Sequence, residues 1–247
     1  MDKIITALQA NPIGPSNMSV GWVNNIARAD KNIWEQLGRG RAIPSTEEQL
    51  DQYLWSYGPM VKCQWDKLTA SVVFDQQSCS IIDYGCGQGL AGCHLMDRVS
   101  WLRANVSQMV LIEPSPVGLR RAEALMKAYC PNAAIQSFNT KLDQVEEKDI
   151  GFVSQHLKIH LFSNILDVEG FHLGAILTKA LSKGTHLFLA VGNVRKNSGG
   201  ARTKIAYEAL IDPKYSDKFK VQFHDSQNFT CRNGIKCIFF AVDLVVS

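Results

Sequence analysis

A run of ten residues combines an apolar strand pattern, an acidic residue and three alternating glycines, and it constrains the fold more than any other feature. The run is Ser80-Ile81-Ile82-Asp83-Tyr84-Gly85-Cys86-Gly87-Gln88-Gly89. Its apolar residues predict a buried strand, and its glycines predict a tight turn into a helix. Glycine tolerates positive φ and lets a ligand approach the backbone. The following helix would direct free N–H groups at a ligand bound there.

Asp83 narrows the choice of ligand, because a carboxylate repels phosphate and attracts an amine. At this point the chain resembles the class I S-adenosylmethionine-dependent methyltransferases, whose first motif is an acidic residue followed by x-Gly-x-Gly-x-Gly. Asp83 to Gly89 fits every fixed position of that motif. The resemblance implies that Asp83 holds the ammonium end of the cofactor S-adenosyl-L-methionine, often through water. It also implies that Gly85, Cys86, Gly87 and Gly89 lie against its methionine part.

A dinucleotide site is the rival interpretation of the same glycines. Gly87-Gln88-Gly89-Leu90-Ala91-Gly92 matches the fingerprint G-x-G-x-x-G, and Glu113 follows Gly92 by 21 positions, close to the spacing that this fingerprint requires. Asp83 argues against it, because the fingerprint has no carboxylate ahead of its first glycine. A purely structural glycine turn is the third interpretation. We favour the methyltransferase site.

Length and charge set broad limits. The 247 residues suffice for one α/β domain with an appendage. No apolar run approaches the roughly 18 residues of a membrane span, and residues 1–6 lack the pattern of a secretory signal. We therefore expect a cytoplasmic protein with no membrane partner. The net charge of +3 does not require a nucleic-acid partner, and the clusters Arg39-Gly40-Arg41 and Arg195-Lys196 are typical of solvated surface.

The cysteines and histidines give no clear metal signal. The seven cysteines form no C-x-x-C pair, which favours reduced thiols over a disulfide framework or a zinc site. His156 and His160 are spaced as a metal-binding pair on a helix, but residues 157–161 have the pattern of a strand. We expect no metal site.

Residues 1–75 predict a helical N-terminal cap, which carries four of the five tryptophans. The Pro- and Gly-containing segment 11–16 is expected to end any helix before it. Ser19 is expected to cap a helix that runs to about Leu37.

The second half of the cap predicts two further helices. Ser45 and Glu48 are three positions apart and form an expected capping box at the start of the first. Gly58-Pro59 is expected to end that helix. A separate helix is then expected over residues 60–73.

Residues 76–247 predict the cofactor-binding domain, because short apolar runs alternate with helical stretches and so indicate parallel strands with crossover helices. The expected strands span 79–83, 108–113, 133–138, 157–163 and 185–192, and the expected helices lie near 89–103, 115–130, 140–149 and 168–182. Two strand-like segments, 218–224 and 235–246, follow around the turn signal Asn233-Gly234. The resemblance implies an α/β, Rossmann-like methyltransferase sheet in the order 3-2-1-4-5-7-6, with an antiparallel last hairpin.

Further cofactor contacts are expected where the second and third strands end. Glu113 ends the second strand, and in the resembled family a carboxylate there accepts hydrogen bonds from both ribose hydroxyls, which suits its two oxygens. Pro114 opens the next helix beside it. The family contacts adenine after the third strand, which indicates Thr140 together with Asn139 or Asp143.

The acceptor site is expected at the end of the fourth strand, where the fold places the transferable methyl group. We expect Ser163 to contact the cofactor, and Asn164, Asp167 and Tyr57 of the cap to be catalytic. Asp167 is alternatively a helix cap. The segment 163–166 lacks both prolines and the aromatic of the Asn/Asp/Ser-Pro-Pro-aromatic tetrad found in amino-methylating nucleic-acid enzymes.

The resemblance implies a transferase that moves a methyl group from S-adenosyl-L-methionine to an acceptor. RNA, protein and small molecules all stay open as the acceptor. The alternative is a non-catalytic S-adenosylmethionine-binding or interaction module that keeps the methyltransferase fold, since no recognisable substrate motif is present. Tyr53, Trp55 and Tyr57 either close over the bound molecules or pack the cap against the sheet.

Overall fold

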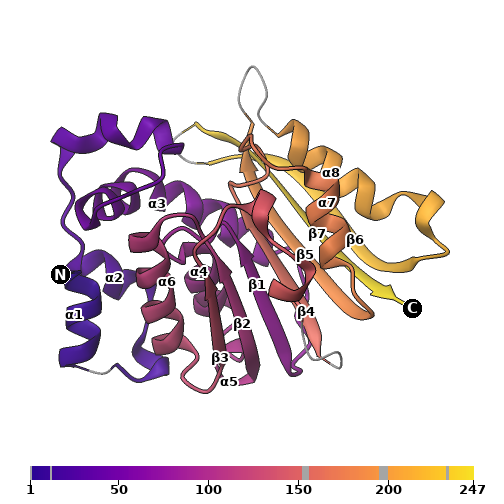
Figure 1. Cartoon of the computed structure of the whole chain (residues 1–247), viewed down its shortest axis with the longest axis horizontal. Coiled ribbons are helices and arrows are strands. Elements are labelled where there is room, and N and C mark those ends of the chain that lie inside the picture. Colours follow the sequence, from indigo (N-terminus) through magenta and orange to yellow (C-terminus); the bar gives the residue numbers. More distant parts are fainter. Residues whose placement is uncertain (1, 12, 152–155, 195–199, 232–233) are drawn as a thin grey trace.

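The computed structural model describes residues 2–11, 13–151, 156–194, 200–231 and 234–247. Seven strands form one sheet in the order β3-β2-β1-β4-β5-β7-β6 (Figure 1). Strands β1 to β5 are parallel, and β7 pairs antiparallel with both β5 and β6. The expected sheet order and terminal hairpin are thereby confirmed.

The strands agree closely with the expected segments, except that the expected strand 218–224 continues six residues further, to Thr230. They are β1 (Cys79–Tyr84), β2 (Val106–Ile112), β3 (Ala134–Phe138), β4 (Leu157–Ser163), β5 (Gly184–Asn193), β6 (Phe219–Thr230) and β7 (Lys236–Val246). Apolar runs predicted the central strands well because all of the residues in β1, six of the seven in β4 and seven of the ten in β5 are buried. Of the expected turn between β6 and β7, Asn233 lies outside the described residues, as does the Arg195-Lys196 cluster.

The helices differ from expectation at three places after β1, the first being the helix expected near 89–103, which ends at Arg98 and is followed by a separate short helix from Leu102. The helices are α1 (Lys3–Ala10), α2 (Val20–Ile26), α3 (Glu47–Thr69), α4 (Leu90–Arg98), α5 (Leu102–Asn105), α6 (Pro116–Tyr129), α7 (Leu173–Ala180) and α8 (Ala201–Ile211). The expected helix at 140–149 is two short 3₁₀ turns, Leu142–Gln144 and Glu147–Asp149. Helix α8 was not expected, because Thr203, Ala206 and Leu210 form its buried face and only Leu210 is strongly apolar.

Two apolar cores lie on opposite faces of the sheet. Successive strand residues point to opposite faces, and Ile81 belongs to one core whereas Ile82 belongs to the other. Helices α3, α4 and α6 cover the first face together with α1 and α2, and α7 and α8 cover the second. In Figure 1 the cap, in indigo, lies beside α4 and α6, at the end of the molecule opposite α7 and α8.

The first part of the cap is less helical than expected. Ser19 caps α2 as expected, because its Oγ accepts a hydrogen bond from the Trp22 amide. The helix ends at Ile26 rather than Leu37, and Lys31–Gly40 is a 3₁₀ helix. The amide of Arg28 donates to the Asp51 carboxylate over 2.8 Å instead of to a carbonyl of its own helix, so a contact with α3 ends α2.

Helix α3 is continuous, so the expected break at Gly58-Pro59 is wrong. Gly58 and Met60 are buried on either side of Pro59, and this packing outweighs the amide hydrogen bond that a proline removes. The expected capping box of Ser45 and Glu48 does not form. Thr46 is the N-cap, and the Gln49 side chain accepts the Ser45 amide over 2.7 Å.

A disulfide joins Cys63 of α3 to Cys231, which follows β6, so the expectation of reduced thiols is wrong for this pair. The sequence concealed it because 168 positions separate the two cysteines. Within the described residues, no group of His, Cys, Asp and Glu is arranged to hold a metal ion. Of the helices in the same part of the chain, none has the length and apolar character needed to cross a membrane.

Candidate functional site

The glycine turn follows β1 in a conformation that other residues adopt only with strain. Gly85, Gly87 and Gly89 have φ of 68°, 56° and 85°, in the left-handed region that favours glycine. A Cβ on Gly85 would lie 2.7 Å from the Ile165 side chain, whereas a Cβ on Gly87 would meet nothing within 4 Å. The Gly87 backbone therefore borders open space, as a ligand contact there requires.

Glu113 lies next to this turn, immediately after β2. Its Oε2 accepts the Gly87 amide over 2.9 Å, and its Oε1 accepts the Ser115 amide over 2.8 Å. Burial raises the pKa of the Glu113 carboxyl, and the two amides oppose that rise. A carboxylate offers about four lone-pair sites, so each oxygen can still accept a hydroxyl.

Asp83 is buried beneath the turn, with a side-chain exposure of 2%. Its Oδ1 has no hydrogen-bond partner among the described residues. Burial and the charge of Glu113 raise the pKa of Asp83 to about 8, and a hydrogen bond from the Gly92 backbone opposes the rise. A buried polar atom without a partner is rare in native proteins, and an ammonium group or a water bound to one would satisfy it.

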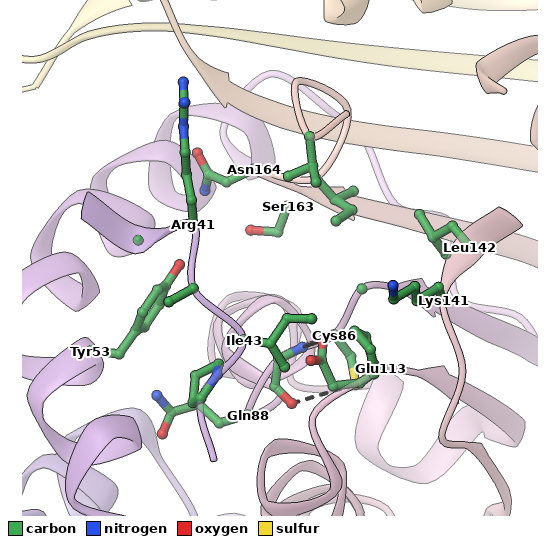
Figure 2. A pocket seen from close by; sticks show the side chains of 18 of the residues that line it. Arg41, Ile43, Tyr53, Cys86, Gln88, Glu113, Lys141, Leu142, Ser163 and Asn164 are labelled. Atoms are coloured by element: carbon green, nitrogen blue, oxygen red, sulfur yellow. Dashed lines mark hydrogen bonds between the residues drawn. The ribbon is translucent and has the colours of Figure 1, made fainter. Parts of the chain in front are cut away.

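A cavity of about 380 Å³ lies between the glycine turn, the cap and the end of β4 (Figure 2). Seven of the expected site residues line it: Gly85, Cys86, Gly87, Glu113, Pro114, Ser163 and Asn164. Asp83 and Gly89 lie behind this surface rather than among the lining residues. A Cβ on Gly89 would lie 3.1 Å from the Ala122 backbone, so this glycine serves the packing of the turn against α6.

The cap forms the opposite wall of the cavity. The segment 40–44 and the side chains of Leu50, Tyr53 and Val61 line it. The buried Ser115 hydroxyl donates to the Pro44 carbonyl and ties this segment to the start of α6. No local sequence pattern indicates this contact, because it joins residues 71 positions apart.

The loop after β3 closes one end of the cavity. Lys141, Leu142 and Asp143 line it, whereas Thr140 does not and instead donates its hydroxyl to Gln144 over 3.0 Å. The side-chain amide of Asn139, Nδ2, donates to the backbone carbonyl of Glu113 over 2.9 Å. Of the two expected candidates for adenine, Asp143 is therefore the one that faces the cavity.

At the end of β4 the polar side chains are bonded to helix α3. Trp65 Nε1 donates to Ser163 Oγ over 3.1 Å, and Gln64 pairs with the Asn164 amide. Asn164 is the one described non-glycine residue with positive φ, at 57°, and such strain often marks functional sites. In Figure 2, Ser163, Asn164 and Tyr53 face the same part of the cavity.

Tyr57 and Asp167 differ from the other expected acceptor-site residues, because neither lines the cavity. The Tyr57 ring packs against Tyr53, with 4.9 Å between ring centroids. The Asp167 carboxylate accepts the Gly200 amide at the start of α8 over 3.1 Å. This contact resembles the helix-capping alternative, although the helix concerned starts 34 positions later (Asp167 to Ala201).

Three residues of the site, Gln64, Trp65 and Gln88, were not predicted from the sequence. Gln64 and Trp65 lie in the middle of a helix and carry no motif. Gln88 lies inside the glycine motif at a variable position, yet its side chain is 3% exposed and lines the cavity. Of these three residues, only Gln88 could have been found from the sequence, because it lies between two glycines of the motif.

The sheet order and antiparallel hairpin are those of the class I S-adenosylmethionine-dependent methyltransferase fold, as the resemblance implied. No protein-family model and no curated protein matches the chain. Among solved structures, it is similar to a SAM-dependent methyltransferase from Leishmania major, with 13% identity over 85% of this chain and 82% of that chain and a TM-score of 0.47.

Two other similar structures contain S-adenosylhomocysteine (SAH). The N-methyltransferase NodS from Bradyrhizobium japonicum has 13% identity, coverage of 86% of this chain and 98% of that chain, and a TM-score of 0.45. The plantazolicin methyltransferase BpumL has 10% identity, the same two coverages of 86% and 98%, and a TM-score of 0.47. Identities this low do not transfer an activity or a substrate to this chain.

Proposed function

We propose that the chain binds S-adenosyl-L-methionine in this cavity and is an S-adenosylmethionine-dependent methyltransferase. One observation carries the proposal: the partnerless Asp83 oxygen, the glycine turn and Glu113 meet at the carboxyl ends of the neighbouring strands β1 and β2. Ligands of open α/β sheets bind at such strand ends.

The residues present fit the cofactor's chemical groups. Asp83 has an unmet acceptor for the ammonium, directly or through water. Glu113 has lone pairs left for the two ribose hydroxyls. Asp143 and Leu142 offer an acceptor and an apolar contact for adenine at the far end of the cavity.

S-adenosyl-L-methionine supplies a methyl group on a positively charged sulfur. The acceptor would approach between the cap and the end of β4, where Tyr53, Ser163 and Asn164 face the cavity. These residues orient the acceptor's nucleophile, and the apolar Val61 and Ile165 beside them help to exclude water. The acceptor itself is RNA, protein or a small molecule.

The second candidate is a non-catalytic module that binds the cofactor. It is favoured by the hydrogen bonds that commit Ser163 and Asn164 to α3 instead of to an acceptor. Methyl transfer to any acceptor would exclude this candidate. Cofactor binding without transfer, across RNA, protein and small-molecule acceptors, would support it.

Calorimetric titration with SAH tests the cofactor assignment. Replacing Glu113 with Gln should weaken binding by about 1.5–3 kcal/mol, the scale of hydrogen bonds to a charged group. The matched control is Glu208→Gln, on the exposed face of α8, which should bind like the wild type. NAD binding without SAH binding would reject the proposal.

A further inference from the structure

A buried arginine connects the N-terminal cap to helix α6. Arg121 is 1% exposed, and its Nε donates to Asp2 Oδ2 over 2.7 Å. Its Nη1 forms an ion pair with Asp51 Oδ1 at 2.8 Å. Asp2 is the N-cap of α1, and Asp51 lies in α3. A buried guanidinium needs such partners to offset its desolvation.

The same arginine reaches the glycine turn through Gln88. Arg121 Nη1 donates to Gln88 Oε1 over 2.9 Å, and Gln88 Nε2 donates to the Leu50 carbonyl of α3 over 2.9 Å. Both ends of the Gln88 amide are therefore held, one by α6 and one by the cap. Gln88 lies between Gly87 and Gly89, so its fixed side chain restrains the flexible backbone on both sides.

We propose that Arg121 is a positioning residue that acts through Gln88 to hold the glycine turn in its ligand-ready conformation. Arg121 does not line the cavity, so it has no direct contact with a ligand there. The contacts from Asp2 through Arg121 to Gln88 make this one cap contact, rather than docking of the cap in general, a condition for the shape of the turn. The part of this inference that concerns cofactor affinity rests on the proposed function.

A purely structural ion pair would hold α1 and α3 in place without affecting the turn. Two substitutions in the full chain separate these roles. Asp2→Asn keeps the helix cap at Oδ1, which accepts the Ile4 amide, but removes the charge opposite Arg121. Gln88→Met keeps the length of the side chain and leaves the pairs of Arg121 with Asp2 and Asp51 intact.

Asp97→Asn is the control, because Asp97 also ties the cap to the sheet domain. Its Oδ2 accepts the Val20 amide over 2.9 Å, and it has no hydrogen bond or ion pair with Arg121 or Gln88 among the described contacts. This variant loosens the cap without altering the connection to the turn.

Hydrogen exchange of the backbone amides in residues 85–90, followed by mass spectrometry on the ligand-free chain, decides between the roles. We expect Asp2→Asn and Gln88→Met each to speed exchange about tenfold, and Asp97→Asn to leave it unchanged. Adding Asp2→Asn to Gln88→Met should then change nothing further in this segment. Additive effects of the two substitutions, or unchanged exchange in Asp2→Asn, would overturn the positioning role.

Titration with SAH gives the second readout. The two single variants and the double variant should all bind about tenfold more weakly, the effect of one lost hydrogen bond to a charged group. A wild-type chain that does not bind SAH would refute the proposed function. The exchange rates would still decide the role of Arg121.

Discussion

Gln64 and Asn164 pair their side-chain amides reciprocally, across 100 positions of sequence. Gln64 Nε2 donates to Asn164 Oδ1 over 3.1 Å, and Asn164 Nδ2 donates to Gln64 Oε1 over 2.8 Å. The same Gln64 amide lies 3.0 Å from Asn193 Oδ1. Helix α3 thus holds the strained residue at the end of β4, and the cap becomes part of the wall of the proposed acceptor site.

Replacing Gln64 with Leu should destabilise the protein by about 1–3 kcal/mol, because the half-buried amide of Asn164 loses both of its hydrogen bonds to Gln64. Urea unfolding measures the loss. Gln77→Leu, at an exposed position before β1, is the control and should stay within about 0.5 kcal/mol of the wild type. Equal stability of Gln64→Leu and the control would show that the amide pair contributes nothing.

Binding of SAH should release a proton from Asp83 near neutral pH. The pKa of this carboxyl is about 8 in the free protein, so it is mostly protonated at pH 7. A bound ammonium favours the ionised form and lowers that pKa. Affinity should therefore rise as the pH increases from about 6 toward 7.5.

Calorimetry in two buffers of different ionisation enthalpy detects the released proton. The wild type should give buffer-dependent heats, whereas Asp83→Asn should bind more weakly and give heats that do not depend on the buffer. Identical heats for the wild type in both buffers would show that Asp83 does not ionise on binding.

The fold was predictable because its central strands are buried on both faces. Ile81 and Ile82 are both apolar because each faces one of the two cores, so β1 lacks the polar–apolar alternation of a half-exposed strand. Local signals failed where tertiary contacts outweighed them. Pro59 stays inside α3 because its neighbours are buried, and α2 ends early because the Arg28 amide bonds to Asp51.

The cofactor end of the site was more predictable than the acceptor end. Glu113 and the glycines lie where strands end, so sequence spacing places them together. The wall opposite comes from residues such as Tyr53 and Val61, whose approach to the cavity depends on how α3 docks. No local pattern encodes that docking.

Acid should destabilise the protein through a buried pair of histidines. Tyr84 Oη lies 3.1 Å from His160 Nδ1, His160 Nε2 lies 2.9 Å from His186 Nδ1, and His186 Nε2 lies 2.6 Å from the Ser182 carbonyl. The Ser182 carbonyl can only accept, so His186 Nε2 donates to it. His186 Nδ1 then accepts from His160 Nε2, and His160 Nδ1 accepts from the Tyr84 hydroxyl, with both histidines neutral. Burial lowers the pKa of His186 to about 4 and that of His160 well below its usual value.

Because the folded pKa values lie below the unfolded value near 6.5, the unfolded state binds more protons as the pH falls from about 6.5 to 4. Each histidine should therefore lower the free energy of unfolding by up to about 1.4 kcal/mol per pH unit in that window. His160→Gln should flatten this slope relative to the wild type. Asp83, whose pKa is raised to about 8, contributes a slope of the opposite sign, but it does so in both proteins and drops out of their difference. Gln222→Ala, at an exposed position of the edge strand β6, removes no titratable group and should leave the slope unchanged; an equal flattening in both variants would contradict the assignment.

Reduction should destabilise the protein, because the Cys63–Cys231 disulfide closes a long loop between α3 and the end of β6. Disulfides typically contribute about 2–4 kcal/mol by restricting the unfolded chain. A phosphine reductant should lower the melting temperature of the wild type to that of Cys63→Ser, and it should not affect the variant. Non-reducing peptide mapping should recover the two cysteines in one linked fragment. Seven titratable thiols in the denatured, unreduced wild type, the full cysteine count of the chain, together with no effect of reductant on melting, would show that the bond does not form in solution.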